Sequence, residues 1–470
     1  KQQFIKKMQT STLLQLLQEM SVYRRNRLRR FLQSPYHNQR EDVLALFEYI
    51  DQHIDGDWAP LSKVPAFQKI YPGQAYDERQ LRYLMSFLMK NIEQFLIAEQ
   101  LKEEEIGAQR LLLQAYRDTA GPKSFQKALR RARQLQGQTE RAEFFYHDRF
   151  AIEREEYLFR AGRKRDAPSQ LPHLNAALDE AYLISRLKQS CLLSAHQAVF
   201  REEEEGSGLL ALLMGFLEDS TFLDNPLLAA YYYYLKAVED PEEVAYYQAL
   251  KELILPEALP PEERRPLFLL AINYGIRQFN DGQDGYLQEL FELYRTGLAE
   301  GLLLPEGRLS RFAFKNITAI ALRLRQFEWT ERFIGEYQQY LPPRHCENYV
   351  HYCLSKLRFE QGRLGDAMER LRQVEYEDLF LSIDAKIMLM KIYYERQEHD
   401  ALDSFLKSFE RFLRRHKELT YHRENYFNII YFTRKLLEVN PFDKEARAAL
   451  RREVEETPTL TERGWLLERV

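Results

Sequence analysis

Apolar residues recur every three or four positions along most of this chain. After Asp77 the apolar positions are Leu81, Leu84, Met85, Leu88, Ile92 and Phe95. This spacing places one side of an α-helix in a core and leaves the opposite side polar. Asp77 itself has a side chain suited to the N-cap of that helix. Because the same period continues through most of the sequence, we predict an all-α fold.

The beginning of the chain predicts a compact group of helices. A single helix is expected over residues 12–33 and is ended by Pro35, because the residue before a proline avoids the α conformation. Asn38 and Glu41 have the spacing of a capping box, which predicts an N-cap at Asn38. We expect residues 1–100 to form a helical N-terminal cap domain.

The rest of the chain divides into a less regular and a more regular part. We predict that residues 101–260 form an irregular series of helical hairpins. We predict that residues 261–470 form regular helical hairpins followed by capping helices. Near the end, Thr459 and Glu462 have the spacing of another capping box, which predicts the start of a last helix there.

The regular part contains a repeat. Residues 361–367 (QGRLGDA) end one apolar helical run and open the next, and residues 396–402 (RQEHDAL) do the same. Ala367 and Ala401 are 34 residues apart. This period resembles that of the tetratricopeptide repeat, a helix–turn–helix unit that buries its apolar face only against its neighbours. The resemblance implies a tetratricopeptide-like α-solenoid.

The match to that repeat is degenerate. Gly362 stands at the expected turn and Ala367 where two helices approach closely, whereas the following unit has Arg396 in place of the turn glycine. The phrases VEYED at 374–378 and LMKIYY at 389–394 also resemble a group of uncharacterised helical proteins from Bacteroidota. That second resemblance implies no known activity.

Composition agrees with a soluble, ordered helical protein. Hydrophobic residues make up 45% of the chain and charged residues 29%, while 19 Gly and 18 Pro are few for 470 residues. Three cysteines cannot form a fully paired disulfide framework, which favours a reducing compartment. The longest strongly apolar run, at 209–217, is too short to span a bilayer. We therefore expect a cytoplasmic protein without a membrane partner.

The tetratricopeptide resemblance also implies a binding surface. In such folds the first helix of each unit lines a concave face that binds peptides or partner helices. The positions carried over are Tyr349, Tyr352, Lys356, Phe359, Lys386, Met390, Tyr393 and Tyr394. The alternative is that several of these side chains pack between helices. On the first interpretation the protein is an interaction scaffold or adaptor for a protein or peptide partner.

Charge suggests a second function. Residues 1–165 carry 29 Lys and Arg against 21 Asp and Glu, and the remainder carries 38 against 50. A basic string near the start contains Arg24, Arg25, Arg27, Arg29 and Arg30. These arginines are suited to phosphate contacts, which favours a nucleic-acid-associated regulator as the alternative function. Arginines spaced along an amphipathic helix also form solvated faces paired with nearby acids.

Catalytic and metal-binding chemistry is not predicted. The sequence lacks a phosphate-binding glycine loop followed by Lys-Ser/Thr, a His-Glu-x-x-His motif and a G-x-S-x-G elbow. His345, Cys346, His351 and Cys353 suggest zinc, but on one helix they face different sides, and a shared ion would require the helix to start after Cys346. We therefore predict no enzyme, cofactor or metal site.

Overall fold

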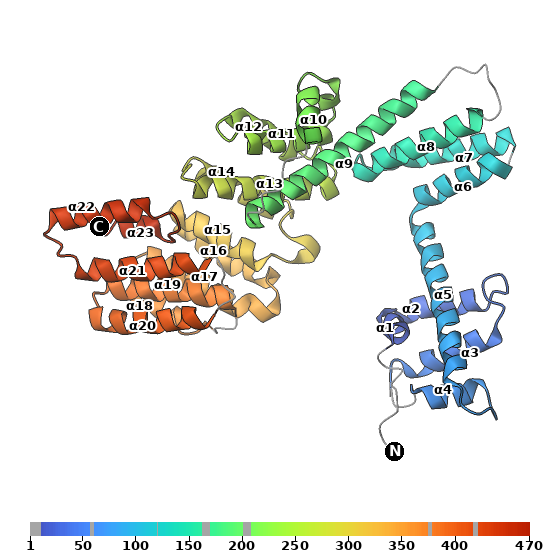
Figure 1. Cartoon of the computed structure of the whole chain (residues 1–470), viewed down its shortest axis with the longest axis horizontal. Helices are drawn as coiled ribbons and strands as arrows, with labels where there is room; N and C mark the ends of the chain where they lie inside the picture. Colours follow the sequence, from blue (N-terminus) through green and yellow to red (C-terminus); the bar gives the residue numbers. More distant parts are fainter. Residues whose placement is uncertain are drawn as a thin grey trace. The chain divides into compact units, whose positions relative to one another are not determined.

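The computed structural model gives the fold over most of the chain. The residues that it describes are 11–56, 61–119, 121–161, 170–200, 208–374, 378–416 and 422–470. Within these ranges it contains 23 α-helices and no β-strand (Figure 1), which confirms the all-α prediction. The chain forms two compact units, Lys1–Ser185 and Arg186–Val470. The expected boundaries after residues 100 and 260 each lie within one of these units, and the three-part division stays a prediction.

The first unit begins with five helices around one core. They are α1 (Thr12–Glu19), α2 (Val22–Leu32), α3 (Glu41–His53), α4 (Lys63–Ile70) and α5 (Glu78–Glu103). Leu14, Leu28, Phe47 and Ile92 are fully buried where α1, α2, α3 and α5 meet. Apolar side chains from four helices thus form the core that their periodicity predicted.

The expected helix over residues 12–33 is wrong, because the chain breaks at Met20. Met20 has extended backbone angles, and the hydroxyl of Ser21 caps α2 by accepting a hydrogen bond from the amide of Arg24. The break is stabilised by Arg25, whose guanidinium donates to the Met20 carbonyl at 2.8 Å and is itself held by Asp51 of α3. That bond satisfies a carbonyl at the end of α1.

The two capping predictions in this unit have opposite outcomes. Asp77 is the N-cap of α5 and accepts hydrogen bonds from the amides of Arg79 and Gln80, as predicted. The prediction for Asn38 is wrong: α3 starts at Glu41, and the Asn38 amide instead donates to the carbonyl of Leu32 at 3.0 Å. Asn38 therefore fixes the loop rather than the helix end.

Three further helices follow in the first unit, before the helix that contains its boundary. They are α6 (Glu105–Thr119), α7 (Pro122–Gln138) and α8 (Glu143–Ala161). They pack on one another around a separate apolar cluster, in which the rings of Phe125 and Phe159 stack with centroids 3.8 Å apart.

The second unit is a series of helices that pack largely in chain order. After α9 (Leu171–Phe200), which contains the boundary, come α10 (Gly208–Glu218), α11 (Pro226–Glu239), α12 (Val244–Ile254), α13 (Pro261–Asn280), α14 (Tyr286–Ala299), α15 (Arg311–Arg323), α16 (Phe327–Tyr337), α17 (Pro343–Glu360), α18 (Leu364–Leu371), α19 (Leu379–Glu395), α20 (His399–Arg415), α21 (His422–Glu438), α22 (Lys444–Glu456) and α23 (Arg463–Leu467). Each odd-numbered helix from α11 to α19 packs against the next helix. The first helices also contact one another, α11 with α13, α15 with α17 and α17 with α19 (Figure 1).

One type of turn recurs between paired helices. Gly282, Arg325, Gly362 and Gln397 each adopt a positive φ after the first helix of a pair. In each case the positive-φ residue and the residue after it donate their amides to carbonyls of the last turn of that helix. This geometry is a Schellman-type helix end, which favours glycine because it has no Cβ.

The turns correct the expected register of the repeat. The residue that matches Gly362 is Gln397, with a φ of 60°, and not Arg396. Counted from the turn, the fourth residue of α18 is Ala367 and the fourth of α20 is Leu402, and both are fully buried. Ala401 is exposed. The structural repeat is therefore one residue longer than the spacing of the two alanines.

Candidate functional site

The first helices α15, α17 and α19 share a surface, here called the first-helix face, that is crossed by two ion pairs. Arg311 of α15 lies 3.1 Å from a carboxylate oxygen of Asp378, directly before α19. Lys315 of α15 lies 2.5 Å from a carboxylate oxygen of Asp384 in α19. The hydroxyl of Tyr349 in α17 donates to the same oxygen of Asp378 at 3.0 Å. The three helices are thus held together across this face.

The predicted binding residues do not all lie on this face, because Lys386 and Tyr393 contact the rings of Phe412 and Phe405 in α20. Tyr349 and Tyr352 expose only 3% and 5% of their surface, and Met390 is fully buried. Burial raises the pKa of both tyrosines above the ordinary range, so their hydroxyls stay protonated. The remaining five predicted residues, Lys356, Phe359, Lys386, Tyr393 and Tyr394, are partly buried. For Tyr349, Tyr352 and Met390, burial supports the alternative that they pack between helices.

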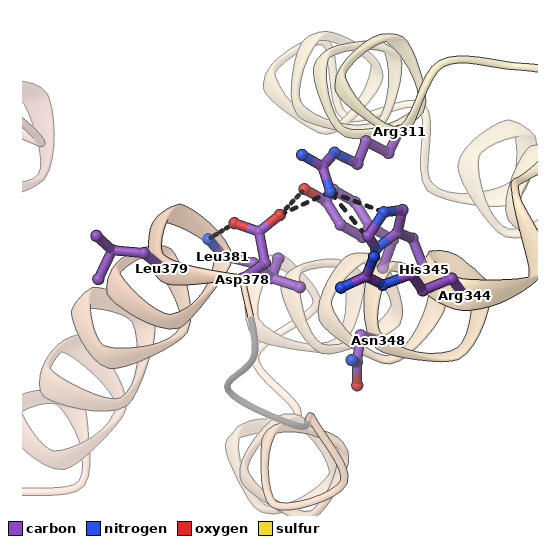
Figure 2. A pocket seen from close by; sticks show the side chains of 8 residues that line it. Arg311, Arg344, His345, Asn348, Asp378, Leu379 and Leu381 are labelled. Atoms are coloured by element: carbon purple, nitrogen blue, oxygen red, sulfur yellow. Dashed lines mark hydrogen bonds and ion pairs between the residues drawn. The ribbon is translucent and has the colours of Figure 1, made fainter. Parts of the chain in front are cut away.

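A pocket of about 370 Å³ opens at the N-terminal ends of these helices (Figure 2). It is lined by Arg311, Arg344, His345, Asn348, Tyr349, Asp378, Leu379 and Leu381. Helix α17 starts at Pro343 after Pro342, and no side chain caps it. The positive end of its helix dipole therefore faces this region without a carboxylate of its own.

Both carboxylate oxygens of Asp378, which lines the pocket, accept hydrogen bonds from the protein. One of its oxygens accepts hydrogen bonds from the amides of Phe380 and Leu381, at 3.1 and 3.2 Å, and so caps α19. The other accepts from Tyr349 and Arg311. Burial by itself would raise the pKa of Asp378, but these donors outweigh it and hold the pKa below the ordinary value. Asp378 is therefore ionised at neutral pH and fully engaged by the protein.

The two arginines of the pocket differ in what they contact. Arg311 is held by Asp378 and also donates towards Nε2 of His345 at 3.0 Å. Arg344 is exposed and has no ion pair with any residue in the described ranges. Figure 2 shows its guanidinium beside the pocket, on the same helix as Asn348. Among the residues that the structure describes, none pairs with the Arg344 guanidinium, whereas Arg311 is already paired with Asp378.

The opposite end of the first-helix face is covered by residues 459–470. Lys391 of α19 donates to Glu462 at 2.8 Å, and the Trp465 indole donates to Glu395 at 2.9 Å. The predicted capping box at Thr459 and Glu462 is wrong. Glu462 is itself the N-cap residue of α23, with a left-handed φ of 56°, and its side chain makes no capping hydrogen bond because it reaches Lys391 of α19 instead.

The basic string of the first unit is mostly paired. Arg25 exposes 3% of its surface and bonds Asp51 at 2.6 Å and Asp55. Arg27 pairs with Glu99 at 2.7 Å, and Arg29 pairs with Asp51. Arg24 and Arg30 are exposed. For three of the five arginines, then, the structure supports the alternative of a face paired with nearby acids.

The His and Cys residues near the start of α17 do not form a metal site in the structure. Cys353 is fully buried, which raises its pKa to about 12, so its thiol stays protonated. The thiol of Cys346 donates to the carbonyl of Gln338 at 3.4 Å. Among the residues whose positions are described, no group of three or more His, Cys, Asp or Glu is placed to hold a metal ion.

Comparisons of the chain with protein families, with curated proteins and with solved structures gave no match. None of the helices in the described ranges is both long enough and apolar enough to cross a bilayer.

Proposed function

We propose that the protein is an interaction scaffold built on a tetratricopeptide-like solenoid. Three features support the solenoid: the pairing of consecutive helices, the contacts of α11 with α13, α15 with α17 and α17 with α19, and the same turn at Gly282, Arg325, Gly362 and Gln397. In a solenoid each unit contacts only its neighbours, and the aligned first helices offer one extended surface for a partner.

The observation that carries the binding proposal is Arg344. Its exposed guanidinium lies at a pocket in which the second arginine, Arg311, is already paired with Asp378. A guanidinium binds a carboxylate through two parallel hydrogen bonds, and the uncapped start of α17 also favours an anion. Leu379 and Leu381 supply apolar lining beside it. A partner segment with an acidic residue next to an apolar one fits this chemistry.

The alternative function has less support. A nucleic-acid interface on the basic string would have to rely on Arg24 and Arg30, because the other three arginines make ion pairs. Exposed cations that are free of acids release counterions on binding phosphate, whereas paired ones first have to give up their partner. Proteins, rather than nucleic acids, are therefore the proposed partners.

Affinity purification of the full chain from its native cells tests this proposal. The wild type is compared with Arg344→Glu, and Arg30→Glu is the matched control because it reverses an exposed arginine far from the pocket in sequence. We expect a protein partner that survives high salt, is lost from Arg344→Glu and is retained by Arg30→Glu. Recovery of nucleic acid only at low salt, lost from Arg30→Glu, would favour the alternative function.

A further inference from the structure

Residues 459–470 make contacts of the kind that a bound peptide makes. Glu462 is held by Lys391 at 2.8 Å, and Arg323 and Lys356 are close enough to act on it electrostatically. Burial would raise the pKa of Glu462, but these three cations, Lys391 first, hold it below the ordinary value. The cations come from α15, α17 and α19, so three first helices converge on one carboxylate.

An aromatic anchor follows one helical turn later. Trp465 exposes only 6% of its surface and donates its indole N–H to Glu395 at 2.9 Å. Its ring meets that of Tyr394 edge to face with centroids 5.3 Å apart, and the Lys391 ammonium lies 5.7 Å from the indole centroid. Buried aromatic side chains with one satisfied polar atom are typical anchors of peptide interfaces.

The surface under this segment overlaps the surface that the repeat pattern predicted. Lys356 and Tyr394, two of the predicted binding residues, act on Glu462 and Trp465 respectively. A third predicted binding residue, Phe359, has its ring centroid 5.1 Å from the Lys391 ammonium. The predicted face is therefore occupied at this end by a segment of the same chain.

The segment has little structure of its own to hold it in place. Helix α23 comprises five residues, too few to be stable without packing. It is entered through Glu462 in a left-handed conformation, which disfavours residues other than glycine. Its side-chain anchors are Glu462, Trp465, the fully buried Leu466, and Arg469, which lies 2.6 Å from Glu395. The segment also packs on α22, whose Arg447 and Arg451 donate to the carbonyls of Val470 and Leu467 at 2.9 and 3.4 Å.

We infer that the surface of α15, α17 and α19 beneath residues 459–470 is a peptide-binding surface, occupied by this segment as an internal ligand. The partner that replaces it is a short helical segment with the same chemistry: a carboxylate, and three residues later an indole followed by an apolar side chain. The inference shares the first-helix face with the proposed function, but it concerns a different end of that face and does not involve Arg344.

The first test uses a fluorescent synthetic peptide with the sequence of residues 457–470 and the full-length protein. In the Trp465→Ala variant the internal segment loses its aromatic anchor, so we expect the peptide to bind this variant at least about tenfold more tightly than it binds the wild type. A peptide in which glutamate 462 is replaced by glutamine is the matched control and should bind at least about tenfold more weakly than the native peptide. Equal binding to variant and wild type, or equal binding of the two peptides, would overturn the inference.

Hydrogen exchange of the unmodified protein guards against a variant that fails to fold. If the segment is a displaceable ligand, the amides of α23 exchange through an opening that leaves α19 and α21 protected. Exchange of α23 only together with α19 and α21 would identify it as a fixed part of the core and refute the inference. Either result leaves the Arg344 comparison intact, so the two proposals fail independently.

Discussion

Replacement of Asp378 by alanine tests how the first-helix face is held together. Asp378 caps α19 through two amides, accepts the Tyr349 hydroxyl and pairs with Arg311. The Asp378→Ala substitution removes all of these contacts at once. It leaves the Tyr349 hydroxyl buried and the Arg311 guanidinium without its carboxylate, which is why we expect a cost larger than that of an ordinary cap.

The magnitude follows from these parts. Loss of an N-cap costs about 1 kcal/mol. Loss of the hydrogen bond from Tyr349 to a charged acceptor costs about 1.5 kcal/mol. The Arg311 pair has side-chain exposures of 28% and 15%, so we discount it for solvent screening to about 0.5 kcal/mol. Together we expect Asp378→Ala to lower the free energy of opening α19 by about 3 kcal/mol.

Asp443 provides the matched control. It caps α22 through two amides, at 3.1 and 3.0 Å, but it is exposed. Asp443→Ala should therefore cost only the cap, about 1 kcal/mol. Because a chain with two compact units need not unfold in a single step, native-state hydrogen exchange at α19 and α22 is the appropriate assay. Equal costs for the two variants would refute the argument that Asp378 does more than cap a helix.

The same carboxylate predicts a dependence on pH. The native pKa of Asp378 is lowered, so its contribution is fully present above the unfolded value of about 3.9 and is lost as the pH falls through the native pKa. Asp378→Asn keeps a capping side chain and removes the titration. We expect the opening free energy of α19 to fall in acid for the wild type and to fall less for Asp378→Asn.

Three further predictions concern backbone strain, packing and thiol reactivity. Gly362→Ala should destabilise the protein by about 1 kcal/mol and Gln397→Gly should stabilise it by a similar amount, because both positions have a positive φ. Thermal unfolding measures each effect, and shifts of the unfolding temperature in the same direction would contradict the shared turn. Gly297→Ala should cost about 1 to 3 kcal/mol in denaturant unfolding, since its Cβ would lie 2.7 Å from a ring carbon of α13, and a neutral effect would contradict that packing. Thiol labelling followed by mass spectrometry should modify Cys346 well before the buried Cys353; equal rates would show that α17 opens readily.

Much of the helical fold could be predicted from the sequence because apolar periodicity is a local property. The cap at Asp77 is an example, since the side chain bonds amides only two and three residues away. The break at Met20 could not be predicted in this way. The apolar period continues through it, and the bond that satisfies its carbonyl comes from Arg25, whose position is fixed by Asp51 in another helix.

The candidate site was less accessible to the same reasoning. The repeat pattern placed Tyr349 on an open face. It could not predict that Arg311 and Asp378, which are far apart in the sequence, form an ion pair beside Tyr349 and that Asp378 accepts the Tyr349 hydroxyl. Asp378 carried one local signal, since an aspartate directly before an apolar helical run is an N-cap pattern. No local sequence signal pointed to Arg344. It matters because it has no ion-pair partner among the described residues, whereas the other arginine of the pocket, Arg311, pairs with Asp378.

The central claim is that the pocket at Arg344 receives a protein partner, and site-specific crosslinking tests it most directly. A photo-crosslinking residue is placed at position 348, which lines the pocket and leaves Arg344 intact, in the full chain in its native cells, and position 30 serves as the exposed control in the first unit. The account predicts one dominant crosslinked protein at position 348, attached through a segment with an acidic residue beside an apolar one, and absent at position 30. Crosslinks at position 348 that match those at position 30, or that go only to nucleic acid, would contradict it.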